Sequence, residues 1–311
     1  TNPQIHYTFT IQFPVALKPL SRNRMLRITA AISTLLLLLC SAPGSAAPSQ
    51  ILPEPTEELP KIAIILDDLG YNRHAGEQAL QLPGNLTYAI IPFTPYSQTL
   101  AQAAHDRNRE VILHLPMESS DPNRRLDEGG LTSEQDEHEV KQRVKSALDS
   151  VPHIAGLNNH MGSHVTTNVQ IMHWLMQEVQ TRPLYFIDSM TNPHSVANRS
   201  AQHYHIPSLK RDVFLDNVQS EADIDRMFRS LVRIAHKRGH AIAIGHPYPA
   251  TLAYLEKALP RLGELGVQLV DASELVMFHG QPVDQPIDLQ EIMELIVAMP
   301  APESQRLNFS D

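Results

Sequence analysis

Two adjacent carboxylates follow the first apolar segment of the chain. Residues 61–70 read KIAIILDDLG, so Asp67 and Asp68 come directly after the apolar run 62–66. A turn at the end of a strand accounts for one acid readily and for two less well, because neighbouring like charges repel each other. A bound divalent cation would let both acids stay ionised, one as a ligand and the other facing the bound water.

Other side chains with metal-binding or acid–base chemistry lie at the ends of later apolar runs. They are His114, Glu118, Asn158, Asn159, His160, His164, Asp188, Arg211, Asp212, Asp216 and His246. A single Asp after a strand is usually the cap of the next helix, and a single His there is more often a hydrogen-bonded imidazole than a ligand. Asp212 and Asp216 are interpreted in this ordinary way, as turn formers or partners of Arg211. Asp127 is interpreted as a solvated loop residue.

Short apolar runs alternate with amphipathic segments along most of the chain. The runs are 62–66, 86–91, 111–115, 154–157, 184–187, 213–215, 241–244 and 267–270. Helical spacing of apolar residues predicts helices within 134–150, 168–181 and 221–238. Strands that alternate with helices form a parallel sheet, either a barrel or an open doubly wound sheet. The short units between residues 61 and 275 favour a (β/α) barrel.

In parallel α/β folds the groups just beyond the carboxyl ends of the strands gather on one face. The residues expected to meet there are Asp67, Asp68, His114, His160, Asp188 and His246. Imidazole and carboxylate ligands without a thiolate suit Zn²⁺, with Co²⁺, Mn²⁺ and Ni²⁺ as competitors. The sequence therefore predicts a site for a divalent metal.

The chain is expected to contain four parts. Residues 22–47 have a basic start, an apolar run and then small residues, the layout of a secretory signal peptide, and Met25 is the expected start. We therefore assign 1–47 to an upstream segment and signal peptide, with an uncleaved anchor as the alternative. Residues 48–60 are a proline-rich linker, 61–278 the single-domain barrel, and 279–311 a tail. One helix is expected in the tail, at 288–299, either packed on the barrel or bound to a partner.

Charge and cysteine content exclude several classes of function. Loss of residues 1–47 would change the formal net charge from −9 to −13, because that segment holds four basic residues and no acid. Such a surface argues against nucleic acid and anionic lipid as partners. The single cysteine, Cys40, would leave with the signal, which excludes thiolate ligands and cysteine nucleophiles. We expect an exported, periplasmic protein with no stable membrane span after signal cleavage.

Six stretches of the chain resemble the divergent polysaccharide deacetylases, an offshoot of the NodB-homology carbohydrate esterases. They read IAIILDDLGYN (62–72), REVILHLPME (109–118), GLNNHMGSH (156–164), FIDSMT (186–191), KRDVFLDN (210–217) and AIGHPYP (243–249). The resemblance implies an α/β fold, a deformed (β/α) barrel, and metal-dependent removal of acetyl groups from a polysaccharide. By position, Asp67 resembles the catalytic base, Asp68 a metal ligand, His246 the general acid and Asp188 the acid that orients it.

The histidine ligands depart from the family pattern. An H-x-x-x-H is expected after the third strand, where this chain has His114 and Glu118, and the same spacing occurs after the fourth strand as His160 and His164. We therefore expect Asp68, His114 and His160 as ligands, with His164 as a candidate fourth. Further candidate site residues are Glu118, Asn159 and Arg211, the last supplying a positive charge in place of an arginine motif that is missing here.

These observations lead to one expected function and two alternatives. The expected function is an exported, zinc-dependent hydrolase that removes acetyl groups from a cell-envelope glycan, with a glycan or a peptidoglycan-type polymer as its substrate. One alternative is a non-catalytic envelope protein that binds a glycan or another partner on an inherited barrel. The other is a metal-dependent hydrolase of some different exported amide or ester.

Overall fold

The computed structural model describes residues 58–281. Its strands are β1 (Lys61–Leu69), β2 (Thr87–Ile90), β3 (Glu110–Met117), β4 (Ile154–Met161), β5 (Tyr185–Asp188), β6 (Ser208–Lys210), β7 (Val213–Phe214), β8 (His240–Gly245) and β9 (Gln268–Leu269). Its α-helices are α2 (Arg73–Ala79), α3 (Ser97–His105), α4 (Glu137–Ser150), α5 (Val169–Val179), α6 (Ala197–His203), α7 (Glu221–Arg238), α8 (Pro249–Ala258) and α9 (Ala272–His279), and the 3₁₀ turns are η2 (Val165–Thr167) and η3 (Leu259–Leu265). The predicted signal peptide, most of the linker and the expected helix 288–299 lie outside the described residues.

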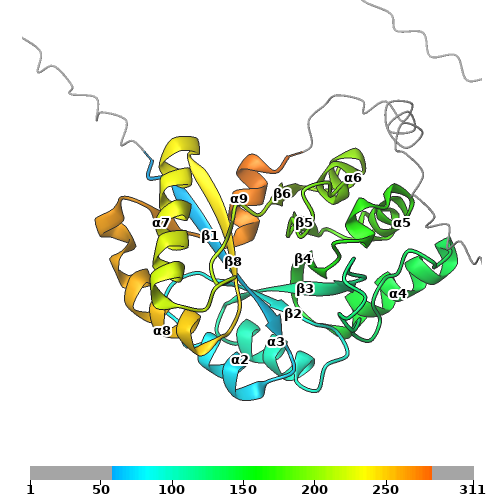
Figure 1. Cartoon of the computed structure of the whole chain (residues 1–311), viewed down its shortest axis with the longest axis horizontal. Helices are drawn as coiled ribbons and strands as arrows, with labels where there is room; N and C mark the ends of the chain where they lie inside the picture. Colours follow the sequence, from blue (N-terminus) through cyan, green and yellow to red (C-terminus); the bar gives the residue numbers. More distant parts are fainter. Residues whose placement is uncertain (1–57, 282–311) are drawn as a thin grey trace, which may run out of the picture. The chain divides into compact units, whose positions relative to one another are not determined.

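The strands form one parallel sheet in the order β6-β5-β4-β3-β2-β1-β8-β7, with β9 paired to β1. Figure 1 shows β1 beside β8, with which it pairs. Sequential strands are neighbours through most of this order, as in a barrel, which excludes the doubly wound alternative. The sheet curls without closing, because β6 and β7 do not pair with each other. The chain between them crosses the gap, where Arg211 N donates to Asp188 O and Asp212 N to Ile242 O, each at 2.9 Å. The predicted fold, a deformed (β/α) barrel, is confirmed.

The three predicted helices are present as α4, α5 and α7, and local signals fix their ends. Asp136 and Glu139 form a capping box at the start of α4, and Ser220 accepts from Asp223 N at the start of α7. Gly239 ends α7 with a positive φ of 85°, a conformation that glycine adopts at low cost. Strand β6 was not predicted, because its three residues SLK carry no apolar run. Within residues 58–281, no helix combines the length and the apolar character needed to cross a bilayer.

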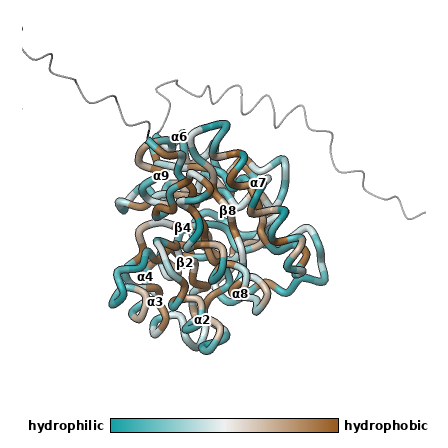
Figure 2. The backbone as a smooth tube through the Cα atoms, turned by 90° about the vertical axis from the view of Figure 1, so that its left-hand side faces the viewer, coloured by the Kyte–Doolittle hydropathy of each residue, from teal (hydrophilic) through white to brown (hydrophobic). Residues whose placement is uncertain are grey.

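Alternating residues of the strands face two different apolar layers. In β1, Ile62, Ile64 and Leu66 pack in the larger layer with the outer helices, whereas Ala63 and Ile65 belong to the smaller layer. Because this smaller layer combines one face of the strands with Leu275 and Val276 of α9, it fills the inside of the barrel. Figure 2 shows hydrophobic residues concentrated along the central strands and hydrophilic residues on many of the outer turns.

Helix α9 closes the end of the barrel where the strands begin. The carboxyl group of Glu110, the first residue of β3, accepts from Thr87 Oγ1 at 2.7 Å, from Tyr185 OH at 2.9 Å and from Ser273 N at 3.2 Å. Thr87 Oγ1 also accepts from Ala272 N at 3.0 Å. These bonds tie the first turn of α9 to strands β2, β3 and β5. The carboxyl ends of the strands remain available for a site.

Glu110→Ala is expected to lower the free energy of unfolding by about 2–4 kcal/mol, because the buried Tyr185 hydroxyl and the Ser273 N–H lose their acceptor. Urea denaturation of the two proteins measures the difference. Glu256→Ala, on an exposed position of α8, is the control and should change stability by less than about 0.5 kcal/mol. Equal effects of the two substitutions would contradict the anchoring role of Glu110.

Candidate metal centre

An irregularity in β1 turns both adjacent carboxylates toward the same site. The register of β1 with β2 shifts between Leu66 and Leu69, and Asp68 has a φ of +60°. In a regular strand, successive side chains point to opposite faces. Asp67 continues the inward series of Ala63 and Ile65, and the left-handed conformation of Asp68 brings its side chain to the same side. The irregularity therefore places the carboxyl groups of Asp67 and Asp68 on the same side of the sheet.

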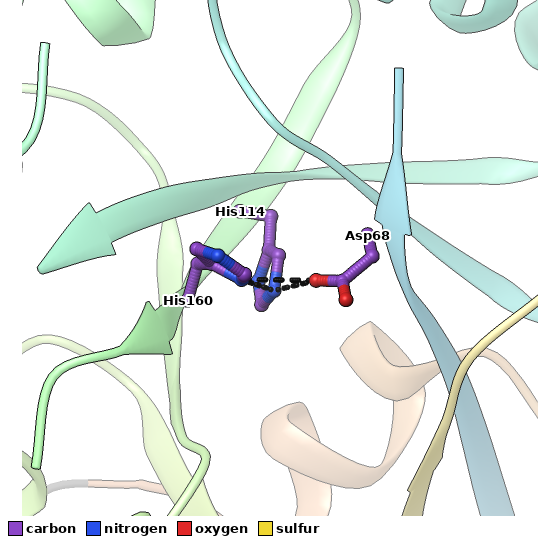
Figure 3. Close-up of side chains that lie close together, drawn as sticks. All are labelled: Asp68, His114 and His160. Carbon is purple, nitrogen blue, oxygen red and sulfur yellow. Dashed lines mark hydrogen bonds and ion pairs between the residues drawn. The ribbon is translucent and has the colours of Figure 1, made fainter. Parts of the chain in front are cut away.

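Asp68, His114 and His160 place three potential ligand atoms at one point (Figure 3). Asp68 Oδ1 lies 3.1 Å from His114 Nε2 and 2.9 Å from His160 Nδ1. The two histidine nitrogens lie 3.1 Å apart. Around a tetrahedral zinc ion with bonds of about 2.0–2.1 Å, ligand atoms lie about 3.3 Å apart, so the observed separations need only small adjustments. The geometry of the three residues therefore fits a divalent metal, and their role as ligands stays a prediction.

Asn158 connects one candidate metal ligand, His114, to Asp67. Its Nδ2 donates to Asp67 Oδ1 at 2.9 Å, which leaves Oδ1 facing His114 Nδ1 at 2.7 Å. Since an amide oxygen only accepts, His114 Nδ1 carries the proton and Nε2 keeps its lone pair for a metal. Asn158 is fully buried, so the ring has little freedom to turn away.

The pKa values of the two adjacent acids are shifted in opposite directions. Burial raises the pKa of Asp67, against the smaller lowering effects of His114 and His246. Burial also acts to raise the pKa of Asp68, but the close contacts of its carboxyl group with His114 and His160 outweigh burial and hold the pKa well below its usual range. Asp68 is thus suited to remain an ionised ligand and Asp67 to accept a proton.

The acid that contacts His246 is Asp216, and the prediction of Asp188 for this position is wrong. Asp216 Oδ1 lies 2.8 Å from His246 Nδ1, and Oδ2 accepts from the backbone N of His246 at 2.6 Å. The Asp188 carboxylate instead accepts from Met190 N, Ser195 Oγ and Asn198 N, the last in the first turn of α6.

Strand alternation explains the exchange of Asp188 for Asp216. Ile187 belongs to the inner layer, so Asp188 faces outward toward α6. Phe214 packs on the inner layer, so Asp216, two residues later, faces inward. The same alternation places His246 inward, two residues after Ile244. The family resemblance suggested Asp188 for this role, whereas the alternation of side chains along the strands, which the sequence also contains, favours Asp216.

The remaining candidates lie outside the ligand cluster. Glu118 accepts from Ser133 N and Oγ, and Asn159 accepts from Ser189 N and donates to Met161 O. His164, the candidate fourth ligand, is exposed at the start of η2 and lies outside the cluster of Asp68, His114 and His160. Arg211 donates to the carbonyl oxygens of Ser189 and Met190 and lies over the Phe214 ring. Its charge is therefore held between strands and does not line the pocket.

A pocket of about 400 Å³ opens above the cluster. Asp67, Asp68, His114, His160 and His246 line it, together with Arg124, Phe214, Tyr248 and other residues of the rim. Asp127, interpreted from the sequence as a solvated loop residue, lies 3.2 Å from His160 Nε2. That interpretation is wrong. The loop has no periodicity from which this contact could have been inferred.

The fold and this site define an α/β barrel with a candidate metal centre at the carboxyl ends of its strands. A family model described as divergent polysaccharide deacetylase matches residues 64–276, and the chain belongs to this family. The uncharacterized protein YibQ of Escherichia coli K12 is 39% identical over 218 residues, covering 70% of this chain and 67% of the relative. An uncharacterized protein of Haemophilus influenzae is 36% identical over 244 residues, covering 78% and 85%. The crystal structure of the uncharacterized protein ATU2773 of Agrobacterium tumefaciens C58 shares the fold, with a TM-score of 0.68, 23% identity, and coverage of 72% of this chain and 92% of that one.

Asp216→Asn is expected to lower the pKa of His246. Burial opposes protonation of this ring, but the hydrogen bond to Asp216 and the charges of Asp68, Asp216 and Asp67 raise the pKa to about 9. NMR titration of the histidine ring, with a chelator present, measures the change. Asp212→Asn is the matched control, because Asp212 lies in the same segment but pairs with Arg238. An unchanged His246 pKa in Asp216→Asn would contradict the assignment.

The raised pKa of His246 also determines how the stability of the protein changes with pH. Because folding raises the pKa of His246 from 6.5 to about 9, its protonation stabilises the fold below pH 6.5, and this contribution is lost as the pH rises toward 9. The stability difference between wild type and Asp216→Asn should therefore be larger near pH 6 than near pH 10. Urea denaturation at the two pH values checks it, and the reverse order would show that the ion pair does not carry the difference.

Proposed function

We propose that this protein is an exported, zinc-dependent deacetylase that removes acetyl groups from a cell-envelope glycan. One observation carries the proposal: a single pocket combines the ligand cluster, the buried Asp67 and the His246–Asp216 pair. These are the groups that metal-assisted hydrolysis of an amide or ester requires. Membership of the divergent polysaccharide deacetylase family supports a glycan as substrate.

The residues of the pocket divide the proton transfers between them. A divalent metal held by Asp68, His114 and His160 would supply Lewis-acid chemistry to the acyl group and to water. Asp67, whose pKa is raised by burial, accepts the proton of the attacking water. His246, whose pKa of about 9 keeps it protonated at neutral pH, donates a proton to the departing amine or hydroxyl.

Other side chains keep these groups in place. Asp216 accepts the His246 Nδ1 proton, which directs Nε2 toward Asp68 Oδ2, 3.8 Å away. Asn158 couples the base to the metal centre, because one amide contacts both Asp67 and His114. Each of the two proton transfers is expected to contribute about 10²–10⁴-fold to the rate.

The rim of the pocket supports a polar substrate such as a sugar. Hydroxyl and amide groups predominate there, among them Ser119, Ser163, Thr191, Asn217 and Gln219. Tyr248 is the aromatic side chain best placed for stacking on a sugar ring, because it lines the pocket with its ring centroid 5.3 Å from that of His246. Export to the periplasm is proposed from the signal-like layout of residues 22–47.

Substitutions of the two adjacent acids should have different effects on zinc binding and on turnover. Asp68→Asn should lose bound zinc and activity, whereas Asp67→Asn should keep zinc and lose about 10²–10⁴-fold in turnover, because only its proton-accepting group is removed. Zinc is measured by elemental mass spectrometry, and turnover by acetate release from N-acetylglucosamine oligomers, peptidoglycan and a generic acetyl ester.

His164→Ala is the matched control for the ligand assignment. It removes the exposed histidine of the H-x-x-x-H spacing and should leave zinc content and turnover unchanged. Full turnover by Asp67→Asn would refute the assigned roles. Zinc binding without acetate release from any of the three substrates would refute the deacetylase and leave a metal-containing binding protein.

A further inference from the structure

Asp127 brings a second carboxylate to the metal centre from outside the sheet. It lies in the segment 118–136 that connects β3 to α4. Its Oδ2 is 3.2 Å from His160 Nε2, and its Oδ1 accepts from Tyr71 OH at 2.6 Å. Both oxygens of this half-buried carboxylate are therefore engaged, one with a metal ligand and the other with a residue that follows β1.

The backbone around Asp127 is held independently of these contacts. Leu131 N donates to Pro116 O at 3.0 Å, and Glu118 N donates to Leu131 O at 2.9 Å, so Leu131 is fastened to the start of the loop. Near its middle, Gly129 packs so closely on Phe93 that an added Cβ would lie 2.4 Å from the ring. Backbone hydrogen bonds and packing therefore hold the loop in a position that places Asp127 beside His160.

The chemistry of the imidazole ring gives this contact a specific consequence. His160 Nδ1 faces Asp68 and His114, so this nitrogen must be unprotonated to bind a metal. The proton of the neutral ring then lies on Nε2, the nitrogen that faces Asp127. A carboxylate that accepts this proton fixes the tautomer, holds the plane of the ring and makes Nδ1 a stronger donor.

The local charge leads to the same conclusion. Among the three ligands only Asp68 is an acid, so the cluster alone would leave one positive charge of a divalent ion uncompensated. Asp127, on the far side of His160, supplies a second negative charge within one imidazole ring of the ligand atoms. His114 is held differently, by the neutral amide of Asn158.

We propose that Asp127 is a positioning residue that holds His160 in its metal-binding orientation and tautomer, and that Tyr71 holds Asp127. The inference rests on the proposed metal site and adds to it the loop between β3 and α4. The same loop contributes Ser119 and Arg124 to the wall of the pocket. Metal affinity and the shape of the substrate pocket consequently depend on one segment.

The test is the zinc affinity of the full chain, measured by competition with a chromophoric chelator in the absence of substrate. Asp127→Ala should weaken zinc binding about 10–100-fold, the usual effect of removing such a partner of a ligating histidine. Tyr71→Phe should weaken it less, because Asp127 remains. Asp127→Asn should lie between Asp127→Ala and wild type, because its amide oxygen can still accept the Nε2 proton.

Glu128→Ala is the matched control, because it removes an exposed carboxylate from the next position of the same loop. Affinity within about twofold of wild type in both Asp127 variants would overturn the proposal. An equal loss in Glu128→Ala would also overturn it, since the effect would then be one of loop charge. If Asp127→Ala does not fold, as judged by circular dichroism, Asp127→Asn and Tyr71→Phe decide.

A second measurement separates positioning from general loop damage. Long-range ¹H–¹⁵N correlation of the zinc-loaded protein should report the Nε2–H tautomer for His160, with the Nε2 proton shifted upfield in Asp127→Asn. An unshifted proton would overturn the hydrogen bond. Zinc binding without deacetylation would refute only the proposed activity, whereas a wild-type protein that binds no zinc would refute both.

Discussion

The site depends on one local departure from strand geometry, the irregularity that lets Asp67 and Asp68 face the same pocket. Without it, strand alternation would send one acid inward and the other under the outer helices. Holding Asp68 in the left-handed region costs about 1 kcal/mol, and two acids at one place repel each other. The repulsion is relieved by unequal surroundings, because Asp68 contacts two histidines while Asp67 lies buried against Asn158. Because both residues are aspartates, the opposite shifts of their pKa values come from their different surroundings.

The rest of the barrel supports this arrangement by assigning its two ends to different tasks. At the amino ends of the strands, Glu110 and Thr87 secure α9, which completes the apolar inner layer. At the carboxyl ends, the same inward positions become polar, as Ile65 gives way to Asp67, Ile112 to His114 and Ile244 to His246. A polar network inside a barrel is stable only when its members are paired, and Asn158 and Asp216 each satisfy more than one neighbour. The inner apolar layer is thus completed at the amino ends of the strands, while the polar groups gather at the carboxyl ends.

Most of the fold and the ligand cluster followed from the sequence, because both depend on short-range pattern. The eight apolar runs all overlap strands, and the strand-end rule brought Asp67, Asp68, His114, His160, Asp188 and His246 together. The family resemblance then singled out Asp68, His114 and His160 as the candidate ligands. The choice of Asp188 rested on its position in the family pattern, and the alternation of side chains in β5 turns this residue outward. The contact of Asp127 with His160 could not be predicted, because it joins a loop to a strand without any repeating pattern and depends on how backbone hydrogen bonds and the packing of Gly129 on Phe93 place the loop. Strand β6 could not be predicted, because only one of its three residues is apolar and the strand is recognisable only by its pairing with β5.

Strand register explains how two histidines on neighbouring strands can form one ligand pair with different ring nitrogens. His114 lies opposite Asn158, and His160 lies opposite Pro116, two residues further toward the carboxyl end. To share a point near Asp68, His114 extends its outer nitrogen Nε2, while His160 presents Nδ1, the nitrogen nearer its backbone. Each ring therefore turns its second nitrogen in a different direction: Nδ1 of His114 inward to Asn158, and Nε2 of His160 outward to Asp127. Distributing the pair over two strands thus creates the need for an acceptor at the rim, and the loop before α4 is the element that provides it.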